Sequence, residues 1–317
     1  MNHNMLEIFL AVCETGTMTN ASKKLYITQP AVSHAISVLE KEFETKLFER
    51  SSNGLYLTSA GKRLRNYAYQ YLDFQKEIYA QVKKEGQKYT IRIGATTAAF
   101  SSVLSPLLSV YKKEHPLAEF YIVSDTAQSI QNMVLSAQLD VALTDGLWKN
   151  GELKQELLRT LPCHFICCAL NEQYQDVMKL EEICQYPFLL PNKNDGVRVA
   201  FDRAMEGVGV TYRLAGEFNN LDMIRRGVAF DHGVSVLPEG LFPPFTNIKT
   251  VDVPDFHFEN DIYLLTHENK HFNQELDCFI RFLKECAIRI PRSYGVVCGK
   301  KLEIKNFLEG SQLSDFY

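Results

Sequence analysis

The chain has 317 residues, a net charge of −4 and an apolar fraction of 46%. This is the length of about two domains with the composition of an ordinary globular protein. The acidic balance argues against a protein that coats nucleic acid or membrane with its whole surface. The first nine residues lack a basic run before an apolar stretch, and no segment approaches the roughly 18 apolar residues of a membrane helix. We therefore expect a cytoplasmic protein without membrane contact.

Three short helices are predicted in the first 42 residues. A first helix is predicted from apolar side chains at helical spacing, namely Met5, Ile8, Phe9 and Val12. It is expected to end near Gly16. Thr19 is expected to cap the second helix and Thr28 the third, where Pro30 is tolerated in the first turn. A tight turn between the second and third helices predicts a helix-turn-helix.

The third predicted helix has two different faces. One is apolar and contains Val32, Ala35, Ile36 and Leu39. Another carries Gln29, Ser33 and Ser37 at four-residue steps, with Pro30, His34 and Lys41 beside them. Small hydrogen-bonding side chains let a helix enter the major groove, where Gln can pair with adenine. Each of these residues taken alone also fits a solvated helix face.

A short hairpin is predicted directly after the third helix. Leu47-Phe48 and Leu55 to Leu57 flank an Asn53-Gly54 pair, which is a strong hairpin signal. A hairpin at this place is a wing, and Arg50 and Asn53 near its tip are predicted to reach phosphate or the minor groove. Residues 1–65 also hold eight Lys and Arg against six Glu, which suits a basic head on an acidic body.

The segment GTMTNASKKLYITQPAVSHAISVLEKEFETKLFERSSNGLYLTSAG resembles the head of the LysR-type transcriptional regulator family. The resemblance is dense over TQPAVS, the LFER stretch and the closing LT-AG. It implies that Gln29, Pro30 and Ser33 lie at the DNA groove and that Arg50 and Asn53 lie at the wing. The chain departs from the family at His34, where Arg is usual, and at Ser22, where Ala is usual. A neutral imidazole offers phosphate one donor in place of a charged fork, whereas the serine is a mild change.

A helix with a coiled-coil-like stripe is predicted after Thr58. The stripe consists of Leu64, Tyr67, Tyr71, Phe74 and Ile78, with Val82 one residue off the seam. A helix packed on its own body is the alternative, because the repeat is short. The resemblance implies a dimer-forming linker helix that can place two heads on half-sites about 34 Å apart, and a homotetramer is the further expectation.

Strands and helices alternate from residue 89 onward, which predicts α/β structure with mostly parallel, doubly wound sheets. The predicted elements include the strands TIRIGA, LAEFYIVSDT, HFICCAL, YPFLLP, YRLAGEF and DIYLLTH. They form two similar lobes, as in periplasmic-binding-protein-like effector domains. We predict a winged helix-turn-helix in 1–58, a linker helix in 59–88 and a two-lobed domain in 89–290. Lobe I comprises 89–162 and 263–290, and lobe II comprises 163–262. Residues 291–317 form a C-terminal extension without an assigned role.

Ligands of open α/β sheets bind at the carboxyl ends of strands, beside helix N-termini. This rule predicts an effector site between the lobes from Thr96, Thr97, Ser101, Thr126, Gln128, Thr144, Arg198, Asn219 and His232. Capping or solvation is the alternative role of each side chain. We expect a small metabolite, with a carboxylate as the preferred class. The family usually has a glycine-rich turn where this chain has Ala229 to Gly233, which predicts a bulkier floor in lobe II.

The other chemistries find less support in the sequence. Cys163 and Cys167 of a strand face opposite to His164 and Cys168, so one metal ion cannot easily collect them. The eight cysteines are irregularly spaced, which predicts packed, reduced thiols, and a cysteine-based redox sensor of the same architecture stays open as an alternative. The sequence lacks a P-loop, a dinucleotide-binding glycine motif and a nucleophile elbow. We therefore expect neither an enzyme nor a bound cofactor. A solute-binding or catalytic α/β protein with an incidental helical head is the alternative from another class.

Overall fold

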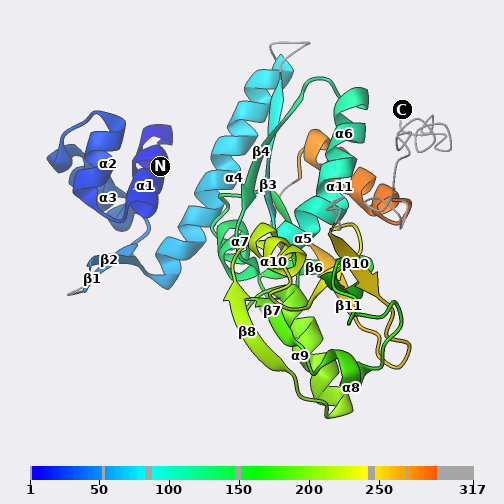
Figure 1. Ribbon diagram of the computed structural model, residues 1–317. Helices are drawn as coiled ribbons and strands as arrows, with labels where there is room; N and C mark the ends of the chain where they lie inside the picture. Colours follow the sequence, from blue (N-terminus) through cyan, green and yellow to red (C-terminus); the bar gives the residue numbers. More distant parts are fainter. Residues whose placement is uncertain are drawn as a thin grey trace. The chain divides into compact units, whose positions relative to one another are not determined.

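The computed structural model describes residues 2–51, 54–82, 88–146, 151–241, 247–268, 270 and 272–290. The chain divides into two compact units (Figure 1). The first contains residues 1–87 with 133–139 and 269–273, and the second contains the rest. None of the helices in the described ranges combines the length and apolarity needed to cross a bilayer. The predicted Asn53 and the extension 291–317 lie outside the described residues.

The first unit begins with a three-helix head, formed by α1 (His3–Thr15), α2 (Met18–Leu25) and α3 (Gln29–Glu42). Its core contains Leu6, Phe9, Val12, Ala21, Val32, Ile36 and Leu39. Gly16 ends α1 in the left-handed conformation, with φ 71°. The prediction that Thr19 caps α2 is wrong. Thr17 is the extended residue before the helix and its hydroxyl accepts from Asn20 N at 3.1 Å, whereas Thr19 already lies inside the first turn.

The hairpin and the long helix follow as predicted. β1 (Phe48–Ser51) pairs antiparallel with β2 (Gly54–Leu57), in a register that opposes Phe48 to Leu57. The Thr58 hydroxyl accepts from Gly61 N at 3.0 Å and caps α4 (Ser59–Val82). Gly61 is required here because a Cβ would lie 2.1 Å from the Leu47 carbonyl oxygen. The wing and α4 are thus packed closely against each other.

In the second unit, lobe I is built on a parallel core. β3 (Tyr89–Ala95) pairs in parallel with β4 (Ala118–Ser124) and β5 (Val141–Asp145). The helices of this lobe are α5 (Thr97–Ala99), α6 (Ser105–Glu114), α7 (Ala127–Leu135) and α11 (Gln274–Ala287). A π-helical turn, η1 (Phe100–Leu104), joins α5 to α6. The helix expected after the first strand is therefore interrupted, at a place where such turns often accompany functional sites.

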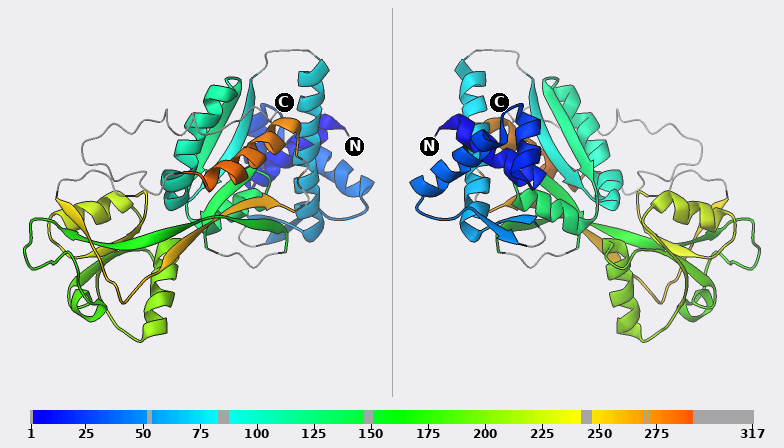
Figure 2. Two further views of the ribbon diagram at one scale, coloured as in Figure 1. Left: turned by 90° about the vertical axis from the view of Figure 1, so that its right-hand side faces the viewer. Right: turned by 90° about the vertical axis from the view of Figure 1, so that its left-hand side faces the viewer.

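Two long antiparallel strands connect the lobes (Figure 2). β6 (Leu153–Cys168) pairs with β11 (Glu259–His267) up to Pro162, and from Cys163 onward it pairs with β9 (Ser235–Pro238) and β10 (Ile248–Val251). β11 also pairs with β5. The two lobes therefore share one continuous strand, β6.

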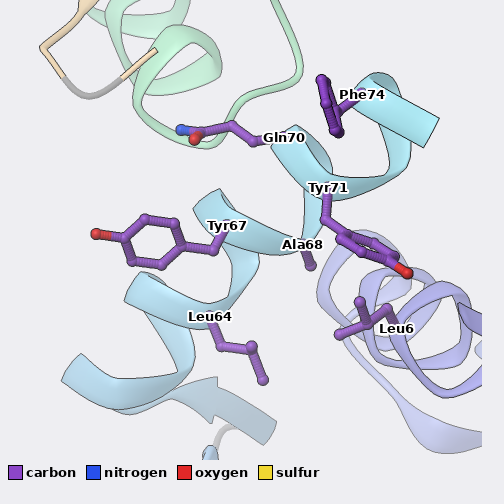
Figure 3. Close-up of a pocket in the computed structure, with 7 residues that line it drawn as sticks. All are labelled: Leu6, Leu64, Tyr67, Ala68, Gln70, Tyr71 and Phe74. Atoms are coloured by element: carbon purple, nitrogen blue, oxygen red, sulfur yellow. The ribbon is translucent and has the colours of Figure 1, made fainter. Parts of the chain in front are cut away.

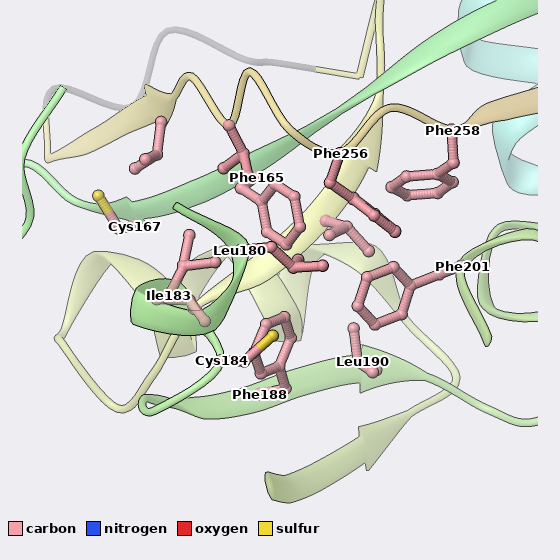
Figure 4. Close-up of a cluster of buried hydrophobic side chains, with 14 of the residues drawn as sticks. Phe165, Cys167, Leu180, Ile183, Cys184, Phe188, Leu190, Phe201, Phe256 and Phe258 are labelled. Carbon is pink, nitrogen blue, oxygen red and sulfur yellow. The ribbon is translucent and has the colours of Figure 1, made fainter. Parts of the chain in front are cut away.

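Lobe II holds the second hydrophobic core. It contains α8 (Leu180–Ile183), α9 (Gly196–Val208) and α10 (Leu221–Ala229) together with the parallel pair β7 (Pro187–Pro191) and β8 (Arg213–Phe218). Aromatic rings fill the core, and the centroid of the Phe201 ring lies within 6.2 Å of the centroids of the rings around it (Figure 4). The observed fold confirms the predicted class, which was a winged helix-turn-helix, a linker helix and two α/β lobes. The expectation of mostly parallel sheets is wrong, because β6 and β11 run antiparallel to all their neighbours and, among the described strands, only β3–β4, β3–β5 and β7–β8 are parallel pairs.

Candidate functional site

The face of α3 opposite its buried side is polar and exposed. Val32, Ala35, Ile36 and Leu39 are buried, whereas Gln29, Pro30, Ser33, His34 and Ser37 are exposed. Thr28 fixes the start of the helix, because its hydroxyl accepts from Ala31 N at 3.4 Å. Every side chain predicted for the groove on this helix is therefore free to contact a partner.

Glu40 positions the wing relative to α3. Its carboxylate accepts from Leu47 N at 2.9 Å and from Lys46 Nζ at 2.7 Å. Burial works against the ionised form, but these bonds and the Phe48 N–H outweigh it and hold the pKa of Glu40 below its usual value. Arg50 lies in β1, at the end of the segment that Glu40 holds.

The linker helix carries an exposed apolar stripe beside its contact with the head core. Tyr67, Tyr71, Phe74 and Ile78 are 45–59% exposed. With Leu64, Ala68, Gln70 and Leu6 of α1, most of them line a shallow groove of about 450 Å³ (Figure 3). The remaining face of α4 packs on α1, where Tyr69 donates to Glu14 at 2.7 Å. The stripe is thus additional to the packing within the unit.

The predicted effector residues fall into buried and exposed groups. Thr96 and Thr144 are buried at the ends of β3 and β5, and Arg198 is buried at the start of α9. Thr97, Ser101, Thr126, Gln128, Asn219 and His232 are exposed. The Thr126 hydroxyl accepts from Ser129 N at 3.3 Å, and the Gln128 amide lies 3.5 Å from Asn132 Oδ1, so both are engaged at the start of α7.

Arg198 is held by lobe II itself. Its Nε donates to Asp202 at 2.8 Å, and Nη1 lies 3.3 Å from Glu217 and 3.2 Å from the Pro191 carbonyl oxygen. Its guanidinium also stands over the Tyr212 ring. A ligand carboxylate would have to compete with two carboxylates of the chain for this cation.

Sequence reasoning missed a meeting point of the lobes at Gly240. A Cβ added there would lie 3.4–3.5 Å from Ser102 of η1. Three buried polar atoms surround this turn without a hydrogen-bond partner among the described residues, and they are Ser102 Oγ, Glu239 Oε2 and Arg225 Nε. Arg225 also donates through Nη2 to the Leu241 carbonyl oxygen. The only sequence signal was a Gly after a strand-ending Pro-Glu pair.

A second missed contact between the lobes involves Asp145. This residue ends β5 and is 2% exposed. Its carboxylate accepts from Asn260 Nδ2 at 3.4 Å and lies against Gly196 at the start of α9. The buried Thr96 hydroxyl lies beside it, outside the geometry of a hydrogen bond. An Asp at a strand end looks like an ordinary turn residue in the sequence, and only the lobe arrangement buries it.

The described cysteines are free thiols, and most are buried. Burial raises the pKa of Cys13 and Cys167 to about 12 and that of Cys184 to about 11. In the described part of the chain, His, Cys, Asp and Glu side chains do not gather in a group that could hold a metal ion.

Comparisons with known proteins agree with this architecture. The chain matches the models of the bacterial regulatory helix-turn-helix protein, lysR family, over residues 3–62 and of the LysR substrate binding domain over residues 84–287. The nitrogen assimilation regulatory protein nac of Escherichia coli is 28% identical over 248 residues, which are 75% of this chain and 79% of that protein.

Two solved structures have a similar fold. A full-length OxyR variant from Pseudomonas aeruginosa superposes with a TM-score of 0.68 at 18% identity, over 92% of this chain and 95% of that one. Full-length CbnR complexed with its target DNA has a TM-score of 0.56 at 17% identity, over 90% of this chain and 100% of that one. At these identities the likeness concerns the fold alone.

Proposed function

The chain belongs to the LysR family of bacterial transcriptional regulators, and we propose that its α3 face reads promoter DNA under the control of a small molecule bound between the two lobes. A DNA-bound regulator works where the chromosome is, so we place the protein in the cytoplasm. In this role the chain binds DNA and a small molecule, and it transmits the binding of the small molecule to the DNA-binding head. It needs neither a catalytic group nor a cofactor for this.

The exposed face of α3 carries this proposal. Gln29 and Ser33 lie one turn apart on a helix whose opposite face is fully buried. Their amide and hydroxyl can hydrogen-bond with base edges in the major groove. A helix face used only for solvation needs no wing beside it, whereas here Glu40 ties the wing to the same helix.

Gln29→Ala and Ser33→Ala are each expected to weaken binding to the cognate site by about 1–3 kcal/mol, because each removes a contact to a base edge. Binding to random DNA should stay nearly unchanged, since phosphate contacts supply it. Fluorescence anisotropy of the full-length protein on both DNAs measures this. Ser109→Ala, at an exposed serine of α6, is the matched control. Equal losses on cognate and random DNA would overturn the assignment.

Arg50→Ala is expected to reduce affinity for all DNA sequences by a similar factor. We propose that this side chain contacts phosphate, so its loss should also reduce the slope of log affinity against log salt by about one unit. A salt titration on cognate and random duplexes measures both. A loss confined to the cognate duplex would assign Arg50 to base reading instead.

We infer that α4 forms the dimer. The exposed stripe of Tyr67, Tyr71, Phe74 and Ile78 and the groove beside it are the kind of apolar surface that a second helix covers. Exposure of the stripe speaks against the alternative in which the helix only packs on its own chain. Two dimers would give the tetramer.

We propose that the effector binds where the lobes meet, near Thr97, Ser101 and the Gly240 turn. The unsatisfied Ser102 hydroxyl and its neighbours at that turn supply buried hydrogen-bonding groups of the sort that ligands complete. A carboxylate stays the first class to screen, because the Thr96–Thr97 segment offers two hydroxyls at the start of a helical turn, although the Thr96 N–H already donates to the Leu143 carbonyl oxygen. Arg198 gives this class less support than the sequence suggested, because Asp202 and Glu217 already pair with it.

Cysteine-based sensing is the second candidate, and burial, which raises the pKa of Cys167 and Cys184, argues against these two thiols as sensors. At neutral pH, a pKa of about 12 in place of 9.0 leaves Cys167 about 1,000-fold less thiolate than an ordinary cysteine, and Cys184 about 100-fold less. We expect iodoacetamide to label both far more slowly in the native than in the urea-unfolded protein, as measured by peptide mass spectrometry. Rapid native labelling of either thiol would revive the redox alternative.

A further inference from the structure

Asp145 joins the two lobes through an unusually close contact. It ends β5 of lobe I, and its carboxyl lies against the first residue of α9 in lobe II. A Cβ added to Gly196 would lie 2.3 Å from Asp145 Cγ and 2.4 Å from Oδ2. Only glycine therefore lets the carboxyl approach the start of α9, where unpaired backbone N–H groups and the helix dipole favour negative charge.

A second carboxyl occupies the same place. Asp195 is the N-cap of α9, and its Oδ1 accepts from Val197 N at 3.0 Å. The Val197 N–H also favours the ionised form of Asp145, so the two carboxyls share the donors of one helix start. Two carboxylates that share the donors of one helix start repel each other, and this repulsion disfavours the state in which both are ionised.

The cation in the first turn of α9, Arg198, pairs with Asp202 and Glu217 and does not form an ion pair with Asp145 or Asp195. β11 contributes the Asn260 amide, the segment before α5 contributes Thr96, and β6 contributes the Cys163 thiol, whose pKa burial and the charge of Asp145 both raise. Among the described residues, neither carboxyl forms an ion pair. In the described part of the chain, the negative charge of the two carboxyls is therefore stabilised only by the N-terminus of α9 and by neutral hydrogen-bond donors. A proton bound to one carboxyl would reduce this charge further.

We propose that Asp145 and Asp195 form a proton-dependent latch, which holds the lobes together at mildly acidic pH and releases them as the pH rises through neutrality. This regulation goes beyond the proposed function and does not depend on how the head reads DNA. It would make the position of the lobes respond to the acidity of the cell as well as to the effector.

The direction follows from the two states of Asp195. With the lobes in contact, burial first and the charge of Asp145 second raise its pKa to about 7. Separated lobes would expose the carboxyl to water and return its pKa toward 3.8. Between pH 3.8 and about pH 7, the joined lobes bind more protons than the separated lobes. Each rise of one pH unit in this range therefore shifts the equilibrium toward separated lobes by up to tenfold. Above about pH 7 both states are ionised, and the equilibrium no longer changes with pH.

Hydrogen exchange of the full-length protein tests the latch. We expect protection of peptides covering the first turn of α9 to fall about tenfold between about pH 6 and pH 8, after correction for the intrinsic pH dependence of exchange. The first turn of α10 serves as the internal control, because its cap is the Asn220 amide, which does not titrate. A flat profile at α9, or an equal fall at α10, would overturn the proposal.

Asp195→Asn separates the latch from a merely structural cap. Asparagine keeps the cap oxygen but loses the titration, so protection at α9 should become independent of pH. Asp145→Asn removes the charge that helps raise the pKa of Asp195 but leaves its burial, so the fall in protection should become smaller and move to lower pH, which keeps the test decisive if the first variant folds poorly. Asp125→Asn, at an exposed carboxylate beside α7, should leave the wild-type profile unchanged. A pH profile that survives both latch variants contradicts the proposal, whatever their DNA binding.

Discussion

Replacing Tyr71 and Phe74 with glutamate is expected to convert the dimer to monomers and to weaken binding to DNA with two half-sites by about 10²–10⁴-fold. Both rings lie on the exposed stripe of α4 and line its groove (Figure 3). In a dimer they would be covered by the second helix, and a glutamate at either position would bury a charge without a partner. In a dimer, binding of one head raises the effective concentration of the second head at the other half-site. Two separate monomers bind the half-sites independently and lack this gain in affinity.

Sedimentation velocity and anisotropy on a two-half-site duplex measure this prediction. Met223→Glu with Phe230→Glu is the matched control, because these apolar side chains of lobe II are 51% and 72% exposed and receive the same substitutions. We expect this control protein to remain a dimer. If the Tyr71 and Phe74 variant also remains a dimer, the α4 stripe is not the dimer surface.

Phe201→Ala should destabilise lobe II by about 3–5 kcal/mol. The ring is completely buried and lies against the rings of Phe165, Phe188, Phe256 and Phe258 (Figure 4). It also packs against the ring of Tyr212. Alanine leaves a cavity that these neighbours cannot fill without moving, because they belong to different strands and loops.

Urea denaturation followed by near-UV circular dichroism measures the loss. Phe230→Ala provides a control in the same lobe, because that ring is 72% exposed and its removal should change stability by less than about 0.5 kcal/mol. Similar midpoints for the two variants would mean that the aromatic cluster does not hold lobe II together.

The local elements of the head were predictable because their signals lie close together in the chain. Thr28, Pro30 and the apolar face of α3 act within one helix, and an Asn-Gly pair sets a hairpin by itself. The cap of α2 was misplaced by two residues, because Thr17 and Thr19 are chemically alike and only the backbone conformation shows that Thr17 is the extended residue before the helix.

The contacts between the lobes could not be predicted from local patterns. HFICCAL was expected as a separate strand, whereas its residues His164 to Cys168 are the end of the 16-residue β6, which changes partners at Pro162. Asp145 and Gly196 are 51 residues apart, and their contact depends on the docking of α9 against β5. Arg198 has the composition of a ligand contact, but Glu217 meets it from a different strand. Pairing over such separations is set by tertiary packing, which periodicity does not encode.

Selection of DNA from a random duplex pool by the full-length protein tests the central claim most directly. A sequence-reading dimer predicts enrichment of one motif that occurs twice, with the two copies about 10 bp or a multiple of that apart. The Gln29→Ala protein should relax the base preference within each copy while keeping the spacing. A pool that emerges without any enriched sequence would contradict the conclusion that the α3 face reads DNA.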